Sequence, residues 1–165
     1  MARPNPIRTT MSFPLPGITY QRRKQFRPQL DDINYAYKII NRHIFNNQLK
    51  KPNITIQATR KTWGTCQWQP EQQPSGSWCD IQLNDKWFCV QWFMNVLAHE
   101  MVHQYQWDID RWQHLDLYGR EPNMYSGAHG PSFFEWREHF EYYGLNLKTW
   151  FRTGRWFRYQ DFTRC

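Results

Sequence analysis

The 165-residue sequence lacks the features of a membrane or exported protein. No stretch reaches the roughly 18 consecutive apolar residues of a membrane-spanning helix, and the most apolar run, 87–94, is interrupted by Gln91. No N-terminal signal peptide is recognisable, because Pro14 and Pro16 interrupt the apolar residues that follow the first arginines. We therefore expect a protein without a membrane partner that resides in the cytoplasm.

Cysteine is also scarce, and its spacing excludes two classes of site. The four cysteines form no C-x-x-C pair, which excludes a zinc ribbon or a thioredoxin-type motif; they are Cys66, Cys79, Cys89 and Cys165. In a chain without an export signal we predict free thiols. Aromatic residues, by contrast, make up 18% of the sequence, which argues against disorder.

Charge is distributed unevenly along the chain. Residues 1–28 carry six basic and no acidic side chains, residues 148–165 carry five basic and one acidic, and the net charge of +7 therefore leaves −3 for residues 29–147. We predict a basic, proline-rich arm over 1–28, a folded domain over 29–147 and a basic aromatic tail over 148–165. The two ends could meet an anionic partner such as DNA, or they could serve solubility or dock on the acidic body.

In the tail, arginines alternate with aromatic residues, a composition suited to single-stranded nucleic acid. Guanidinium groups can contact phosphates while rings stack on bases. The candidate contacts are Arg152, Arg155, Trp156 and Arg158. The alternative is that the aromatic rings pack on the domain as a hydrophobic strap and leave the arginines exposed.

The spacing of apolar residues predicts an α+β domain with a small sheet. Alternating or β-rich segments predict three short strands, at 54–58, 63–68 and 79–83. A 3/4 apolar spacing, together with capping and stop signals, predicts three helices, over 30–46, 86–107 and 131–143. Residues 108–128 lack a period and are predicted to form a loop with no more than a turn of helix.

His99, Glu100 and His103 form the pattern H-E-x-x-H inside the second predicted helix. The spacing of four places both imidazoles on one helix face, where they can bind one Zn²⁺ at about 2.0–2.1 Å. Glu100 lies about 100° round the helix, within reach of a water whose pKa the metal lowers to about 7. The pattern predicts zinc-assisted attack on a carbonyl group. The alternative is a pair of surface histidines on an amphipathic helix.

A catalytic zinc needs a third protein ligand and an open fourth position. The metzincin continuation is absent, because Gln106 and Ile109 stand where it requires glycine and histidine. The residues alone leave several candidates for the third ligand: Asp116, Glu135, Glu138, His114, His129 and His139. We favour His129, because a loop-to-helix junction can direct its side chain back towards the preceding helix.

Together these motifs resemble the SprT-like metallopeptidases, the family of bacterial SprT and the eukaryotic DNA-dependent protease Spartan. The resemblance covers about residues 32–145 and rests on H-E-x-x-H and four further segments: 44–52 (IFNNQLKKP), 62–66 (TWGTC), 79–84 (CDIQLN) and 129–133 (HGPSF). It implies a zincin-like fold in which a C-terminal helix carries the third Zn²⁺ ligand at its start, and it makes His129 that ligand. It also implies hydrolysis of peptide bonds with Glu100 as general base, with DNA-associated proteins as substrates.

The resemblance leaves a second function open. Many relatives carry a C-terminal zinc ribbon and this sequence does not, so it is similar to a minimal form. Ribbon-less forms of this kind resemble those carried by bacteriophages, for which the compartment is the host cytoplasm. The alternative is a nucleic-acid-binding or assembly component that keeps the fold and works through its basic ends. The intact Glu100 favours the peptidase, since a structural role has no need of it.

Overall fold

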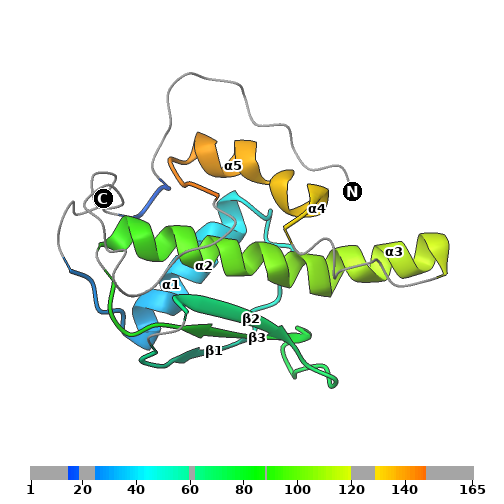
Figure 1. Cartoon of the computed structure of the whole chain (residues 1–165), viewed down its shortest axis with the longest axis horizontal. Helices are drawn as coiled ribbons and strands as arrows, with labels where there is room; N and C mark the ends of the chain where they lie inside the picture. Colours follow the sequence, from blue (N-terminus) through cyan, green and yellow to red (C-terminus); the bar gives the residue numbers. More distant parts are fainter. Residues whose placement is uncertain (1–14, 19–24, 60–61, 88, 120–128, 148–165) are drawn as a thin grey trace.

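A computed structural model describes residues 15–18, 25–59, 62–87, 89–119 and 129–147. Within them the chain is a mixed α/β domain with a small sheet on one side of a long central helix (Figure 1). Most of the predicted arm and the whole predicted tail, including Arg152, Arg155, Trp156 and Arg158, lie outside the described residues. In the described part, no helix is both long and apolar enough to cross a membrane.

The sheet has three strands, as predicted: β1 (Asn53–Ile56), β2 (Gly64–Trp68) and β3 (Cys79–Leu83). Their order is β1-β3-β2, with β3 parallel to β1 and antiparallel to β2. Along β3 the alternate residues Cys79, Ile81 and Leu83 are buried, which places one face of the sheet against the helices. Strand β2 is an edge strand and lies nearest the central helix (Figure 1).

Five α-helices and one π-helical turn complete the described fold. They are α1 (Leu30–His43), α2 (Val90–Tyr105), the π turn η1 (Gln106–Asp110), α3 (Arg111–Tyr118), α4 (Pro131–Phe134) and α5 (Arg137–Tyr142). Helix α2, η1 and α3 run on as one continuous rod, with α4 and α5 on the side of α2 away from the sheet (Figure 1).

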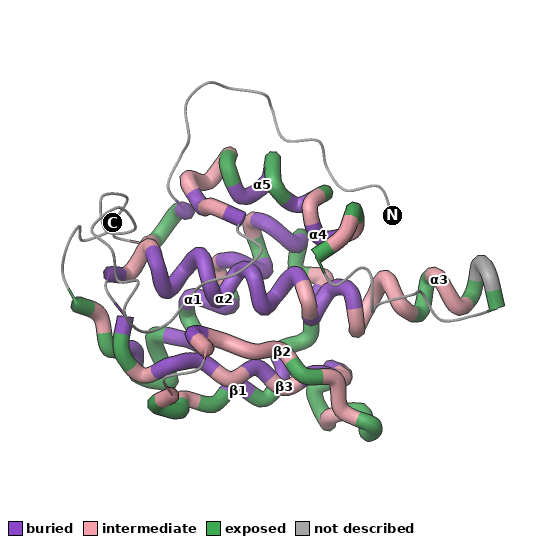
Figure 2. The backbone as a smooth tube through the Cα atoms, in the orientation of Figure 1, coloured by how far each residue is buried: buried purple, intermediate pink, exposed green. Residues whose placement is uncertain are grey.

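Helix α2 is buried along most of its length, between the sheet, α1 and the α4–α5 pair (Figure 2). Large aromatic side chains fill the surrounding core, among them Phe45, Trp87, Phe93, Phe133, Trp136 and Phe140. Because packing on several sides fixes α2, side chains on its one accessible face are held in place.

The structure corrects the predicted loop over 108–128. The rod remains helical to Tyr118 and ends at Gly119, whose positive φ of 64° suits glycine. The apolar period disappears there because α3 projects beyond the core, so no face of it needs an apolar stripe. Residues 120–128 lie outside the described part.

The remaining corrections concern helix ends and one cysteine. The first helix ends at His43, three residues early, and Asn46 and Asn47 follow with positive φ. The single helix predicted over 131–143 is divided into α4 and α5 by a tighter turn, in which the Trp136 N–H donates to the Phe133 carbonyl. Cys66 and Cys79 are free thiols as predicted, but the prediction is wrong for Cys89, which is disulfide-bonded.

Candidate metal centre

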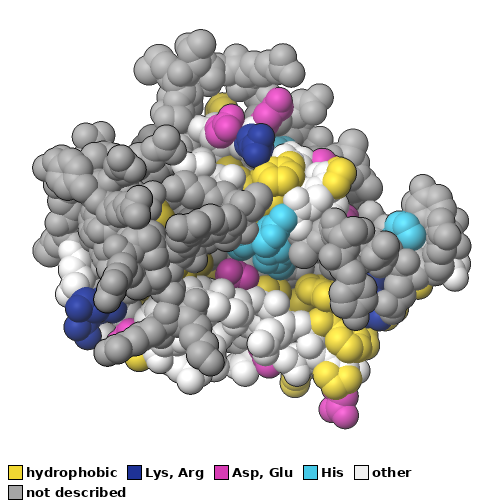
Figure 3. Space-filling view, viewed as in Figure 1, with side chains coloured by type: hydrophobic (Ala, Val, Ile, Leu, Met, Phe, Trp, Pro, Cys, Tyr) yellow, Lys and Arg dark blue, Asp and Glu magenta, His cyan; other side chains and the backbone are white. Residues whose placement is uncertain are grey.

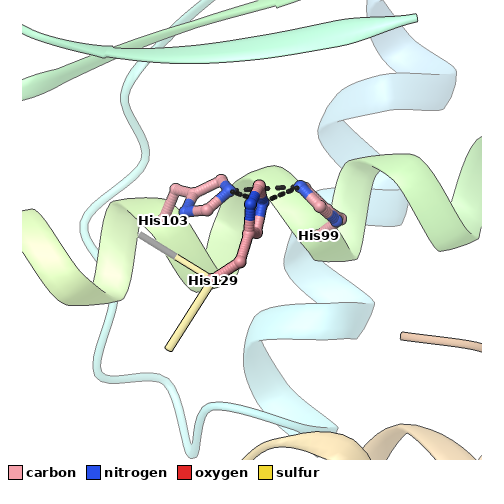
Figure 4. Close-up of side chains that lie close together, drawn as sticks. All are labelled: His99, His103 and His129. Carbon is pink, nitrogen blue, oxygen red and sulfur yellow. Dashed lines mark hydrogen bonds between the residues drawn. The ribbon is translucent and has the colours of Figure 1, made fainter. Parts of the chain in front are cut away.

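Three histidines converge on one point at the surface of α2 (Figure 4). His99 and His103 belong to α2, and His129 stands two residues before α4. The Nε2 atom of His103 lies 3.1 Å from that of His99 and 3.1 Å from that of His129, and the third pair is 3.4 Å apart. Tetrahedral zinc with nitrogen ligands at 2.0–2.1 Å would hold them about 3.3–3.4 Å apart. The triad is therefore positioned to bind a metal ion.

The protonation of the triad also fits a cation. Burial lowers the pKa of His103 to about 4, and burial lowers the pKa of His129 as well. The His103 Nδ1–H donates to the Gln106 side-chain oxygen at 2.8 Å, so a neutral His103 presents the lone pair of Nε2 to its neighbours. Converging nitrogen lone pairs repel one another unless a positive charge lies between them, and a metal ion supplies that charge.

Phe133 packs against all three imidazoles. Its ring centroid lies 4.9 Å from that of His99, 5.2 Å from that of His103 and 4.8 Å from that of His129. Phe133 is fully buried in α4, which begins at Pro131 after the extended Gly130. The segment 129–133 thus supplies a candidate ligand and, one helical turn later, the apolar support for the whole triad.

Glu100 lies beside the triad with its carboxyl group buried. Burial raises the pKa of this carboxyl to about 8, and a hydrogen bond donated by the Cys66 backbone N–H opposes the shift. A Cβ atom on Gly64 would lie 3.1 Å from Glu100 Cγ and 3.2 Å from its Oε1. Gly64 is therefore needed so that the start of β2 can approach the glutamate closely.

Residues 33–149 match the SprT-like family. The chain belongs to the SprT-like family. Membership indicates a metallopeptidase-type domain, and the match covers the sheet, α2 and the segment that carries His129. Among curated proteins, none matches this SprT-like chain.

Gln106 supports the triad of this SprT-like domain, a role that the sequence reasoning missed. Its oxygen accepts from His103, and its Nε2–H donates to Ser132 Oγ at 3.0 Å, so one side chain joins η1 to α4. Its side chain is almost completely buried. In the sequence, Gln106 stands out only because it breaks the metzincin pattern. Its position three residues after His103 is the signal that could have identified its role.

A buried polar network fixes the rod just beyond the metal centre. The Asp108 carboxylate accepts from Ser77 Oγ at 2.7 Å, from the Trp78 backbone N–H at 2.8 Å and from Gln104 Nε2 at 2.9 Å. The Tyr37 hydroxyl donates to the Gln104 oxygen at 2.9 Å. Asp108 therefore ties η1 to the beginning of β3 and, through Gln104, to α1. This network accounts for ordered helix where the sequence predicts a loop.

The other third-ligand candidates lie apart from the triad. Asp116, Glu135 and Glu138 are exposed, and His114 lies on α3. His139 is buried against Trp136, with ring centroids 5.4 Å apart, as an ordinary core histidine would be. Within the described ranges, His99, His103 and His129 are the only such group that could hold a metal ion. Histidine side chains reach the surface beside a band of hydrophobic ones (Figure 3).

Proposed function

We propose that this domain is a zinc-dependent peptidase, with His99, His103 and His129 as ligands and Glu100 as general base. One observation carries the proposal: three imidazole Nε2 atoms converge, and Glu100, the residue after His99 on α2, has a buried carboxyl group. Three histidines that leave a fourth position open are the ligand set of a catalytic zinc. This ligand set therefore favours zinc. Because imidazole also suits copper, iron and nickel, metal analysis must identify the ion.

Zinc, when bound, supplies a Lewis acid for the substrate carbonyl and lowers the pKa of water to about 7. The chain itself supplies the proton transfers. Glu100 takes a proton from the attacking water as the new C–O bond forms, and it returns that proton to the amine nitrogen as the C–N bond breaks. A carboxyl whose pKa burial raises towards neutrality can serve as both base and acid in one cycle.

The position of Glu100 is fixed from two sides. The Cys66 backbone N–H donates to its carboxylate, and the bare Cα of Gly64 leaves room for its side chain. Both contacts come from the edge strand β2, whose outer side is not paired with another strand of the described sheet. A peptide laid along this edge would bring a carbonyl group next to Glu100 and the three histidines.

The test compares metal content and peptide cleavage in two variants. We expect Glu100→Gln to keep about one zinc per chain and to lose at least 10²-fold in the rate of cleavage of an unfolded protein substrate. We expect His129→Ala to lose most of its zinc. Gln113→Ala, a change at an exposed position on α3, is the matched control. Full zinc in His129→Ala, or wild-type cleavage by Glu100→Gln, would refute the assignment.

Action on DNA-associated proteins is a further part of the proposal, supported by the two basic chain ends. The same charge distribution supports a second candidate, a nucleic-acid-binding or assembly component that works through those ends. That component would show salt-sensitive DNA binding that survives Glu100→Gln, without turnover of any protein. Cleavage that disappears in Glu100→Gln would decide for the peptidase.

A further inference from the structure

Four tryptophans and one arginine form a cluster at one end of the site. Trp68 of β2, Trp78 just before β3, Trp107 of η1 and Arg111 and Trp112 of α3 make up this aromatic cluster. The Arg111 guanidinium lies 4.9 Å from the Trp68 ring centroid, 5.8 Å from that of Trp107 and 5.0 Å from that of Trp112. All five side chains are partly exposed, with Trp112 at 36%. The cluster therefore presents ring surface to solvent instead of completing the core.

The aromatic cluster lies further along the helical rod and strand β2, the two elements that position Glu100. Trp107 lies four residues after His103 and seven after Glu100, which is about 6 Å and 10 Å along the helical rod. Trp68 lies two residues after Cys66 on the edge strand, and the Trp68 and Trp107 rings meet at a centroid distance of 6.0 Å. The cluster thus joins β2 to the rod just beyond the candidate catalytic residues.

The charges around the rings favour a neutral occupant. Arg111 already places a guanidinium over three of the rings, which disfavours a second cation there. The Asp108 carboxylate, which accepts a hydrogen bond from the Trp78 backbone N–H, brings the opposite charge to the same cluster, so the two charges offset one another and an anion such as a phosphate gains little there. Exposed ring surface is instead covered favourably by an apolar side chain.

We propose that the aromatic cluster is the substrate subsite for a large apolar side chain, aromatic or branched aliphatic, two or three residues from the cleaved bond. Trp107 lies about 6–10 Å along the rod from His103 and Glu100. An extended peptide rises about 3.3 Å per residue, so this offset corresponds to two or three substrate residues. The inference rests on the proposed peptidase function, and its test separates the two. Substrates of this domain are then segments that expose apolar residues, as unfolded or partly unfolded proteins do.

The first measurement is a positional peptide library cleaved by the wild type, Trp112→Ala and Trp112→Phe. We expect kcat/KM of the wild type to favour Phe or Leu over Asp or Lys at least tenfold at one position. Trp112→Ala should reduce that preference at least fivefold with unchanged zinc content, and Trp112→Phe should restore most of it. Tyr35→Ala, which removes a half-exposed aromatic on α1, is the matched control and should leave the preference unchanged.

A binding measurement keeps the inference testable without turnover. Zinc-loaded Glu100→Gln, with and without Trp112→Ala, is titrated with a labelled peptide containing Phe, with the same peptide containing Ser, and with a labelled dT20 oligonucleotide. We expect tighter binding of the Phe peptide, lost in Trp112→Ala, and no effect of that substitution on the oligonucleotide.

Each remaining outcome decides between the two claims. Cleavage without an apolar preference, or with a preference that Trp112→Ala leaves intact, overturns the subsite and leaves the peptidase standing. Apolar-peptide binding that needs Trp112, without any cleavage by the wild type, supports the surface and rejects the peptidase. If Trp112→Ala loses only the binding of the oligonucleotide, the subsite is overturned in favour of a nucleic-acid surface. If the wild type neither cleaves nor binds the peptides, both claims are overturned.

Discussion

Replacing Gln106 by leucine should weaken metal binding without touching a ligand. The substitution keeps a branched side chain of similar size but removes the acceptor for His103 Nδ1–H and the donor to Ser132 Oγ. Loss of such a supporting hydrogen bond typically costs 10–100-fold in metal affinity, which is about 1.4–2.7 kcal/mol. The His103 N–H would also be left buried without a partner, at a cost of about 1–3 kcal/mol in the free energy of unfolding.

The assay is competition for zinc against a chelator of known affinity, with thermal unfolding of the metal-free protein recorded in parallel. Gln106→Glu keeps an acceptor for His103 and should retain wild-type affinity or exceed it, because a carboxylate makes the imidazole more basic. Gln113→Leu, on the exposed surface of α3, is the control for adding leucine. Equal zinc affinities for Gln106→Leu and the wild type would show that this hydrogen bond does not position His103.

Three further predictions follow from contacts around the triad. Gly64→Ala should displace the Glu100 side chain by a few tenths of an ångström and reduce the rate of peptide cleavage at least tenfold, with zinc retained. An equal loss of cleavage in Thr65→Ala, on the opposite face of β2, would contradict this prediction. Phe133→Ala should lower the free energy of unfolding by about 3–5 kcal/mol in denaturant titrations and weaken zinc binding, so an unchanged midpoint would refute its supporting role. A hydrogen bond with Cys79 and burial raise the pKa of the Cys66 thiol, so thiolate forms only at higher pH. Mass spectrometry should therefore find Cys66 resistant to iodoacetamide at pH 8 until the protein unfolds, and rapid labelling of the folded protein would count against the hydrogen bond between the Cys66 and Cys79 thiols.

The sequence predicts the sheet and the central helix because both are governed by local patterns. Alternation at Cys79, Ile81 and Leu83 corresponds to one buried face of β3, and the apolar period through α2 reflects its burial on several sides. The spacing of His99 and His103 likewise follows from helix geometry alone. These features need no knowledge of which distant segments meet.

The supporting residues are beyond such local patterns because their roles depend on tertiary contacts. Gln106 matters because Ser132 lies beside it, and Gly64 matters because β2 presses against Glu100. The helical state of residues 108–118 is the clearest case. Asp108 is held by Ser77 and Trp78, thirty residues away in sequence, and no periodicity within the segment could have indicated this.

The π-helical turn has a consequence for how chains of this family could diverge in length. Each residue advances an α-helix by about 100° and 1.5 Å, so deleting residue 109 or 110, beyond Gln106 and Asp108, would turn α3 by roughly a quarter of a revolution. The candidate metal ligands, which precede that point or come from the segment before α4, would keep their places. A single-codon deletion could therefore change which surface of α3 faces the candidate metal centre while sparing the centre itself. Length differences among SprT-like chains are expected to concentrate there.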